Sequence, residues 1–87
     1  VELGQKGIWP DAIREHEKAL EMDPHNQTWR TNLSAAHLGF GRWLLGKNNK
    51  NEAMNEFRRA MVIDPANAQA DQELDKVIAS LGKNPMD

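Results

Sequence analysis

The chain has 87 residues, a formal net charge of −2, and 39% hydrophobic against 28% charged residues, which suits one small domain or part of a longer array. It contains no cysteine, so disulfide frameworks and thiolate metal sites are excluded, and the absence fits a reducing compartment. No segment approaches the roughly 18 apolar residues that a membrane-spanning helix needs, and no signal peptide is visible. We therefore expect a cytoplasmic module, and its first residue, Val1, suggests excision from a longer chain.

The first complete helix is predicted to start near Pro10. Proline suits the first helical position because its missing N–H has no partner there, and Asp11 places a negative charge at the positive end of the helix dipole. Ala12 and His16 follow at helical spacing. The helix should end before Pro24, because proline disfavours helical geometry in the residue that precedes it.

A second, longer helix is predicted over roughly 27–46, with Asn26 as its cap. Its apolar seam repeats at spacings of four and three and consists of Trp29, Leu33, Ala36, Phe40 and Trp43. Gly39 and Gly41 each cost a helix about 1 kcal/mol relative to alanine. They indicate either the close approach of another backbone or a break before residue 46.

Two further helices complete the chain. Residues 46–51, GKNNKN, form a turn by composition, and either Asn49 or Asn51 caps a third helix that runs to about residue 63. The fourth helix should begin after Asn67 and end at Gly82. The alternation of apolar and polar residues that marks strands is absent, so we predict an all-α fold of about four helices.

One stretch of the sequence occurs twice. Residues 12–26, AIREHEKALEMDPHN, align with residues 53–67, AMNEFRRAMVIDPAN, at a constant offset of 41. The matched residues are Ala12, Glu15, Ala19, Asp23, Pro24 and Asn26, with Ala53, Glu56, Ala60, Asp64, Pro65 and Asn67. Self-similarity at a fixed period indicates a repeat architecture, which moves the functional question from catalysis to surfaces.

The repeated segments resemble the second helix of the tetratricopeptide repeat (TPR), in which alanines, an aromatic residue and a proline recur at fixed spacing. Phe57 fills the aromatic slot, and His16 replaces it in the first copy. Asn32-Leu33-Ser34 and His37 resemble the first-helix signature, and Leu3, Gly7 and Trp9 match the end of a preceding first helix and the turn after it.

The resemblance implies antiparallel helix–turn–helix repeats in one module over residues 1–87. Residues 1–25 would be the second half of a first repeat, 26–66 one full repeat, 67–82 a closing helix and 83–87 a tail. The period of 41 exceeds the ~34 residues of the family by about seven, which is close to two helical turns.

The extra turns are predicted to make the second helix overhang its partner. We expect the overhang to carry outward a possible apolar contact patch of Phe40, Trp43, Leu44 and Leu45, with Ile8 and Trp9 nearby. The alternative is that the overhang folds against the turns and closes the local core.

The TPR resemblance also implies a concave face that is lined by the first helix of each repeat and grips a peptide or a partner helix. Carried over to this chain, the face comprises Thr28, Thr31, Asn32, Ala35, Gly39, Gln69, Gln72, Glu73, Lys76 and Ser80. Asn32 matches an asparagine that some members use to bind a peptide backbone or terminal carboxylate, although a structural hydrogen bond is the alternative. Those members place Lys and Arg where this chain has Gln69 and Glu73, so we expect no carboxylate clamp.

The remaining polar residues indicate no catalytic, metal or nucleic-acid site. His16 and His37 lie on inward faces and could approach each other, but a metal site would need further ligands, and neutral core histidines are the favoured interpretation. The chain lacks a glycine-rich phosphate loop, and its lysines and arginines are too sparse for a nucleic-acid stripe. We expect no cofactor.

The sequence therefore predicts a non-catalytic protein–protein interaction module, part of a scaffold or adaptor. One alternative is a homo-oligomerisation module, because the incomplete first repeat would leave Ile13, Leu20 and Met22 uncovered. Another is a regulatory repeat segment of a larger enzyme.

Overall fold

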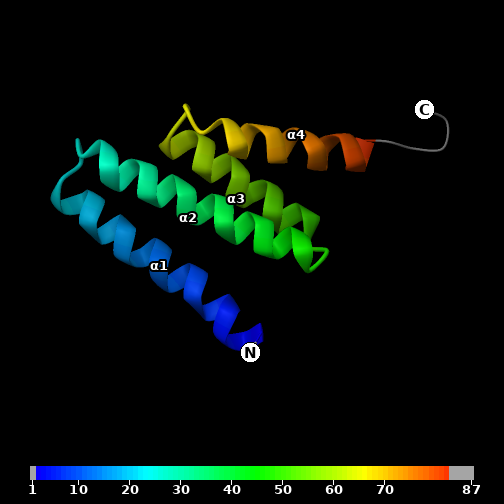
Figure 1. Cartoon of the computed structure of the whole chain (residues 1–87), viewed down its shortest axis with the longest axis horizontal. Coiled ribbons are helices and arrows are strands. Elements are labelled where there is room, and N and C mark those ends of the chain that lie inside the picture. Colours follow the sequence, from blue (N-terminus) through cyan, green and yellow to red (C-terminus); the bar gives the residue numbers. More distant parts are fainter. Residues whose placement is uncertain (1, 83–87) are drawn as a thin grey trace.

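The computed structural model describes the backbone of residues 2–82 and the side chains of residues 9–82. It contains four helices, α1 (Glu2–Met22), α2 (Gln27–Gly46), α3 (Lys50–Ile63) and α4 (Ala68–Gly82). Consecutive helices run in opposite directions and are joined by short turns (Figure 1). The described residues contain no strand, so the predicted all-α, helix–turn–helix architecture is confirmed. The predicted tail, 83–87, lies outside the described residues.

Helix α1 begins eight residues before the predicted start at Pro10 and passes through that proline without interruption. The turn expected between the end of a preceding helix at Leu3 and the start at Pro10 is therefore replaced by continuous helical backbone, and the side chains of residues 2–8 lie outside the described set. Proline in a helix interior loses one backbone hydrogen bond and costs about 3 kcal/mol. Next to this proline, the Trp9 ring lies so close to Gly39 of α2 that a Cβ at that glycine would be 2.5 Å from Cη2 of the ring.

Asparagine caps define the beginnings of the other three helices. The Oδ1 atoms of Asn26, Asn49 and Asn67 accept from the backbone N–H groups of Trp29, Glu52 and Ala70, at 3.2, 3.4 and 3.0 Å. The predicted caps Asn26 and Asn67 are confirmed, and of the two candidates for α3 the structure selects Asn49. Each cap satisfies a backbone donor that the helix itself leaves unpaired.

The two copies of the Asp-Pro-x-Asn motif form the same turn. In each copy the asparagine N–H donates to the aspartate carbonyl, Asn26 to Asp23 at 3.1 Å and Asn67 to Asp64 at 3.0 Å. The α2–α3 turn differs, because Asn48 has a φ of 65°. Asparagine tolerates this left-handed conformation better than most residues.

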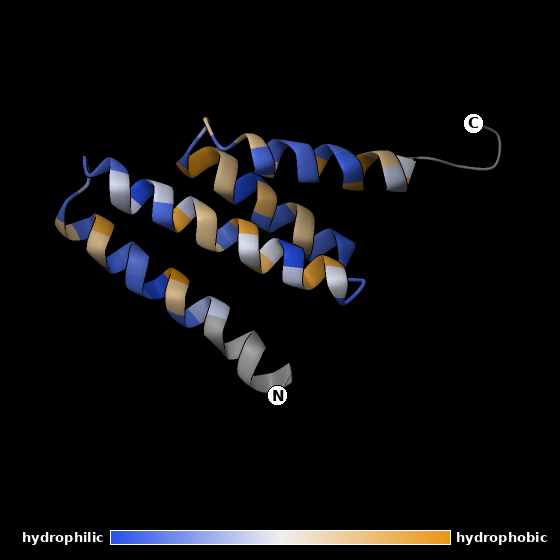
Figure 2. Ribbon diagram, in the orientation of Figure 1, coloured by the Kyte–Doolittle hydropathy of each residue, from blue (hydrophilic) through white to orange (hydrophobic). Residues whose placement is uncertain are grey.

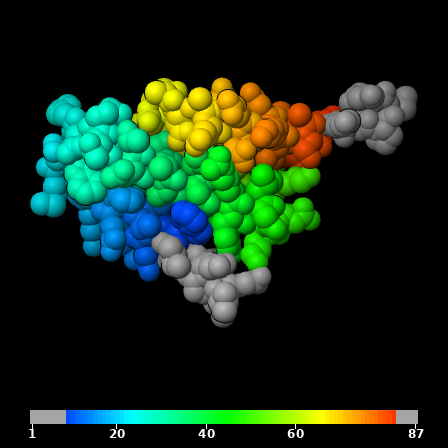
Figure 3. All heavy atoms as spheres, in the orientation of Figure 1, coloured from blue at the N-terminus to red at the C-terminus, as the bar shows by residue number. Residues whose placement is uncertain are grey.

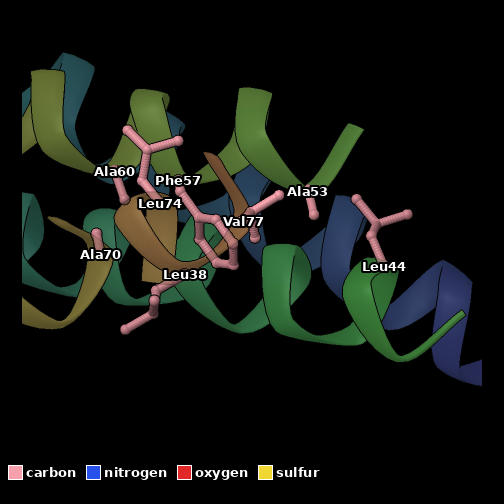
Figure 4. Packing of buried hydrophobic residues seen from close by; sticks show 8 residues of the cluster. All are labelled: Leu38, Leu44, Ala53, Phe57, Ala60, Ala70, Leu74 and Val77. Carbon is pink, nitrogen blue, oxygen red and sulfur yellow. The ribbon is translucent and has the colours of Figure 1, made fainter. Parts of the chain in front are cut away.

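The core lies between α2, α3 and α4. Phe57 is 0% exposed and occupies the middle of the cluster, surrounded by residues of all three helices (Figure 4). Gly41 makes room for this ring, because a Cβ at that position would lie 2.5 Å from Cε1 of Phe57. The close approach that the helix glycines indicated is therefore made by aromatic rings, and α2 runs unbroken to Gly46.

Helix α1 contributes little to this core. Its inward residues Ala12, Ala19 and Leu20 are half-buried, and no described residue of α1 is fully buried. Much of its length is hydrophilic (Figure 2). Helix α1 therefore lies as an outer layer on α2, whereas α3 is enclosed by α2 and α4.

Candidate partner-binding surfaces

The residues predicted to line a concave face lie on α2 and α4, which share the face of the molecule shown in Figure 3. Thr28, Thr31, Ala35, Gln69, Gln72 and Lys76 are exposed, and Asn32 and Glu73 are half-buried. Positions 28, 31, 32, 35 and 39 lie along one side of α2, and positions 69, 72, 73, 76 and 80 lie along one side of α4. We call these two rows the α2 stripe and the α4 stripe.

An ion pair joins the two stripes. The Nε of Arg42 lies 3.7 Å from Oε2 of Glu73. Arg42 lies three residues after Gly39 and therefore continues the α2 stripe. Because Arg42 contacts Glu73, both stripes lie on the same side of the molecule. On α2 the predicted face ended at Gly39 and did not include Arg42, although Arg42 continues the same spacing.

Glu73 and its two charged neighbours together carry a net positive charge. Its side chain is 17% exposed and lies between Arg42 and Lys76, whose Nζ is 3.5 Å from Oε1. The expectation that Glu73 repels a carboxylate did not include the positive charge of Arg42. Two cations facing one carboxylate leave the centre of the surface with one positive charge.

Asn32 lies in the α2 stripe with its amide uncommitted. It makes no side-chain hydrogen bond within residues 9–82, so the structural bond that was its alternative role is absent from the described part of the chain. The neighbouring Ser34 has that structural role instead. Its Oγ donates to the Ala60 carbonyl at 2.7 Å and accepts from Asn67 Nδ2 at 2.8 Å. This network ties α2 to the end of α3 and the start of α4.

The predicted apolar patch is only partly on the surface. Leu44 is 3% exposed and belongs to the core, so the expectation that it projects outward is wrong. It lies at one end of the cluster, on the side of Ala53 (Figure 4). Phe40, Trp43 and Leu45 are half-buried and pack against the core. The side chain of Ile8, the other expected neighbour, lies outside the described residues.

The half-buried part of that patch is ordered by its own contacts. The Phe40 and Trp43 rings stack with their centroids 6.3 Å apart, and Lys47 Nζ lies 5.7 Å from the centroid of the Trp43 ring. Cation–π contact and stacking hold Trp43 along the helix.

A groove of about 590 Å³ lies between α1 and α3, and the sequence analysis did not predict it. Its lining residues are Pro10, Ile13, Arg14, Glu17, His37, Phe40, Glu56, Arg58, Arg59, Val62 and Ile63. They come from three helices separated in sequence, so no local pattern signals their meeting.

The two inward histidines have separate partners. His37 Nδ1 lies 2.7 Å from Glu56 Oε1, buried at the floor of the groove, and Arg59 donates to the other carboxylate oxygen at 3.0 Å. His16 faces the Trp29 ring at a centroid distance of 6.2 Å. The two histidines therefore contact different partners, and His37 is the one that is buried in the core.

The described residues provide neither a metal site nor a membrane-spanning helix. They contain no cluster of three His, Cys, Asp or Glu side chains placed to hold a metal ion. Among these residues, no helix combines the length and the apolar character needed to cross a membrane.

Comparison with known proteins gives a relative that contains TPR repeats. No family model matches the chain, and no solved structure matches it. A TPR repeat-containing thioredoxin of Arabidopsis thaliana is 30% identical over 79 residues, which is 91% of this chain. The match covers 11% of that protein, so the chain spans about a ninth of the relative's length. The resemblance seen in the sequence is thus confirmed: over 91% of its length the chain is similar to a TPR repeat-containing protein, and its four-helix architecture matches that of a TPR-like helical repeat.

Proposed function

We propose that the chain is a non-catalytic interaction module that binds a peptide or a partner helix across the α2 and α4 stripes. The observation that carries the proposal is the Arg42–Glu73 ion pair, because it links two exposed polar rows that lie on the same side of the molecule. TPR-like repeats act as protein–protein interaction modules, which supports the class of partner. The face and the ligand are our inference.

The chemistry of the stripes suits a peptide backbone. Asn32, Gln69 and Gln72 each offer a side-chain amide that can donate and accept hydrogen bonds. Few large apolar side chains lie among them, so hydrogen bonds, not deep apolar pockets, would supply most of the selectivity. The positive charge left by Arg42 and Lys76 around Glu73 favours a peptide with an acidic side chain near its middle.

In the intact protein the module would act within a scaffold or adaptor of the cytoplasm. A repeat segment attached to an enzyme is a second candidate, because the Arabidopsis relative is, by its name, a thioredoxin that contains TPR repeats. The sequence flanking the 87 residues separates the two. A catalytic domain on the same chain would support the second candidate, and further repeats alone would support the first.

Self-association is a third candidate, favoured by the 88% exposure of Met22 at the end of α1. Light scattering at several concentrations tests it directly. A strict monomer at high concentration would contradict self-association and leave the interaction module unaffected.

The binding proposal is tested by selecting peptides from a phage-displayed random library against the chain. We expect the selected peptides to lose at least about tenfold in affinity for an Asn32→Ala/Gln72→Ala double variant. Glu52→Ala, an exposed substitution at the start of α3, is the matched control and should change affinity less than about twofold. Equal binding to the double variant, or no enrichment of any peptide, would contradict the proposal.

A further inference from the structure

The groove between α1 and α3 continues along α1. A second hollow, of about 600 Å³, is lined by Arg14, Glu17, Lys18, Leu20, Glu21, Pro24 and Leu33. Arg14 and Glu17 line both hollows, so the two adjoin. The α1 residues involved, from Pro10 to Glu21, recur at helical spacing along one flank. At 1.5 Å per residue this flank is about 16 Å long.

The walls favour a helical occupant over an extended one. All three helices that line the groove satisfy their backbone groups internally, so an added strand would find no edge to pair with. A helix brings its own hydrogen bonds and needs only an apolar face. Ile13, Phe40, Val62 and Ile63 offer a complementary apolar strip, and Val62 is 81% exposed. About 11 residues of helix would span the length of α1 involved.

The charges of the two walls differ. The α1 wall alternates, with Arg14 and Lys18 against Glu17 and Glu21. The α3 wall carries Arg58 and Arg59, and its one carboxylate, Glu56, is buried and already bonded to Arg59 and to His37. Arg58 forms no ion pair within residues 9–82.

We propose that this groove, on a different surface from the α2 and α4 stripes, docks an amphipathic helix of a partner protein. The partner helix presents aliphatic side chains to Ile13, Val62 and Ile63, and carboxylates along the edge that faces Arg58 of α3. The difference between the walls fixes which edge of the partner helix is acidic, and therefore its orientation in the groove.

The test uses two stapled helical peptides of about 11 residues with leucines on one face. One carries glutamates on a single flank, and the other carries lysines at the same positions. We expect the glutamate peptide to bind the chain at least about tenfold more tightly, with NMR amide shifts concentrated at Ile13, Val62 and Ile63.

Arg58→Glu should lower the affinity for the glutamate peptide at least about tenfold and raise that for the lysine peptide. Arg30→Glu makes the same change of net charge at an exposed site of α2 outside the groove, and should change either affinity less than about twofold. Val62→Asp should remove binding while leaving the fold intact, because Val62 is exposed.

Four results would overturn the proposal. They are no saturable binding of either peptide below about 1 mM, equal affinity for both peptides, shifts confined to the α2 and α4 stripes, and a dimer in light scattering that Val62→Asp dissociates. The last result would assign the groove to a second copy of the chain. The stripes have their own test, the loss of selected-peptide affinity in the Asn32→Ala/Gln72→Ala variant, so the two surfaces are tested separately.

Discussion

The two copies of the repeated segment have the same sequence pattern and different surroundings. In α3, Ala53, Phe57 and Ala60 are fully buried. Their counterparts in α1, namely Ala12, His16 and Ala19, are only half-buried. Helix α3 packs on both α2 and α4, whereas α1 packs mainly on α2. The position of a copy within the array, more than its own sequence, therefore determines how much of it becomes core.

The residue in the aromatic slot follows this difference. An enclosed slot needs a fully apolar ring, and Phe57 fills it without exposure. An outer slot leaves one side of the ring near solvent, so His16 can stack obliquely on Trp29 there. The exchange of phenylalanine for histidine between the copies reflects burial and needs no separate functional explanation.

The largest expected difference between the copies is at this slot. Phe57→Ala should lower the free energy of unfolding by about 3–5 kcal/mol, because it leaves a cavity among three helices, and this is enough to unfold many small domains. His16→Ala should cost about 1 kcal/mol, since its site is half open. Urea denaturation followed by circular dichroism measures both values. Equal losses of unfolding free energy in the two variants would contradict the claim that the Phe57 site is more enclosed than the His16 site.

The two ring-contacting glycines give the next comparison. Gly41→Ala should destabilise by about 1–3 kcal/mol, because the Phe57 ring that blocks its Cβ is held in the core. In Gly39→Ala the new Cβ meets the Trp9 ring of the outer helix, and this ring can shift. The gain in helix propensity, about 1 kcal/mol, offsets the remaining strain. Thermal unfolding of the two variants compares them. A larger loss for Gly39→Ala would mean that α1 is as firmly packed as α3.

The capping asparagines of the two turns should differ as well. Asn67→Ala removes both the α4 cap and the hydrogen bond to Ser34, so we expect it to lower the free energy of unfolding by about 2 kcal/mol. Asn26→Ala removes the α2 cap and an exposed hydrogen bond to Asp23, so we expect it to lower the free energy of unfolding by about 1 kcal/mol. Denaturant midpoints at constant slope measure the difference. The order of the two losses should reverse if the α1–α2 turn is the better packed.

The smallest effects are expected at the ion pairs. Arg42→Ala should cost about 0.5 kcal/mol because Glu73 is largely buried, and Arg14→Ala, whose contact with Asp11 is exposed, should cost about 0.2 kcal/mol or less. Repeating the unfolding measurement at high salt should shrink both values. A loss above about 1 kcal/mol for Arg14→Ala would show that the outer layer depends on charge.

Local signals in the sequence predicted most of the fold. The turn and cap residues Asp23, Asn26, Asp64 and Asn67 act between near neighbours, so their spacing was enough to identify their roles. The burial of Phe57 followed from the family pattern. The start of α1 could not be found in this way, because the local preference of proline for the first turn places a helix start at Pro10, whereas α1 passes through this residue.

The surfaces were less predictable than the fold. The α2 stripe could be extended to Arg42 from periodicity alone. The burial of Leu44 and the groove around Val62 depend on the angle at which helices meet, which hydrophobic spacing does not contain. Sequence periodicity indicates which face of a helix is apolar, and packing decides which part of that face stays open.

NMR mapping of a library-selected peptide on the 87-residue chain tests the central functional claim most directly. We expect the amide shifts to cluster at Thr31, Ala35, Gln72 and Lys76, on the two stripes that Arg42 and Glu73 link. Shifts confined to α1, or to the flank of α3 that carries Val62, would contradict it.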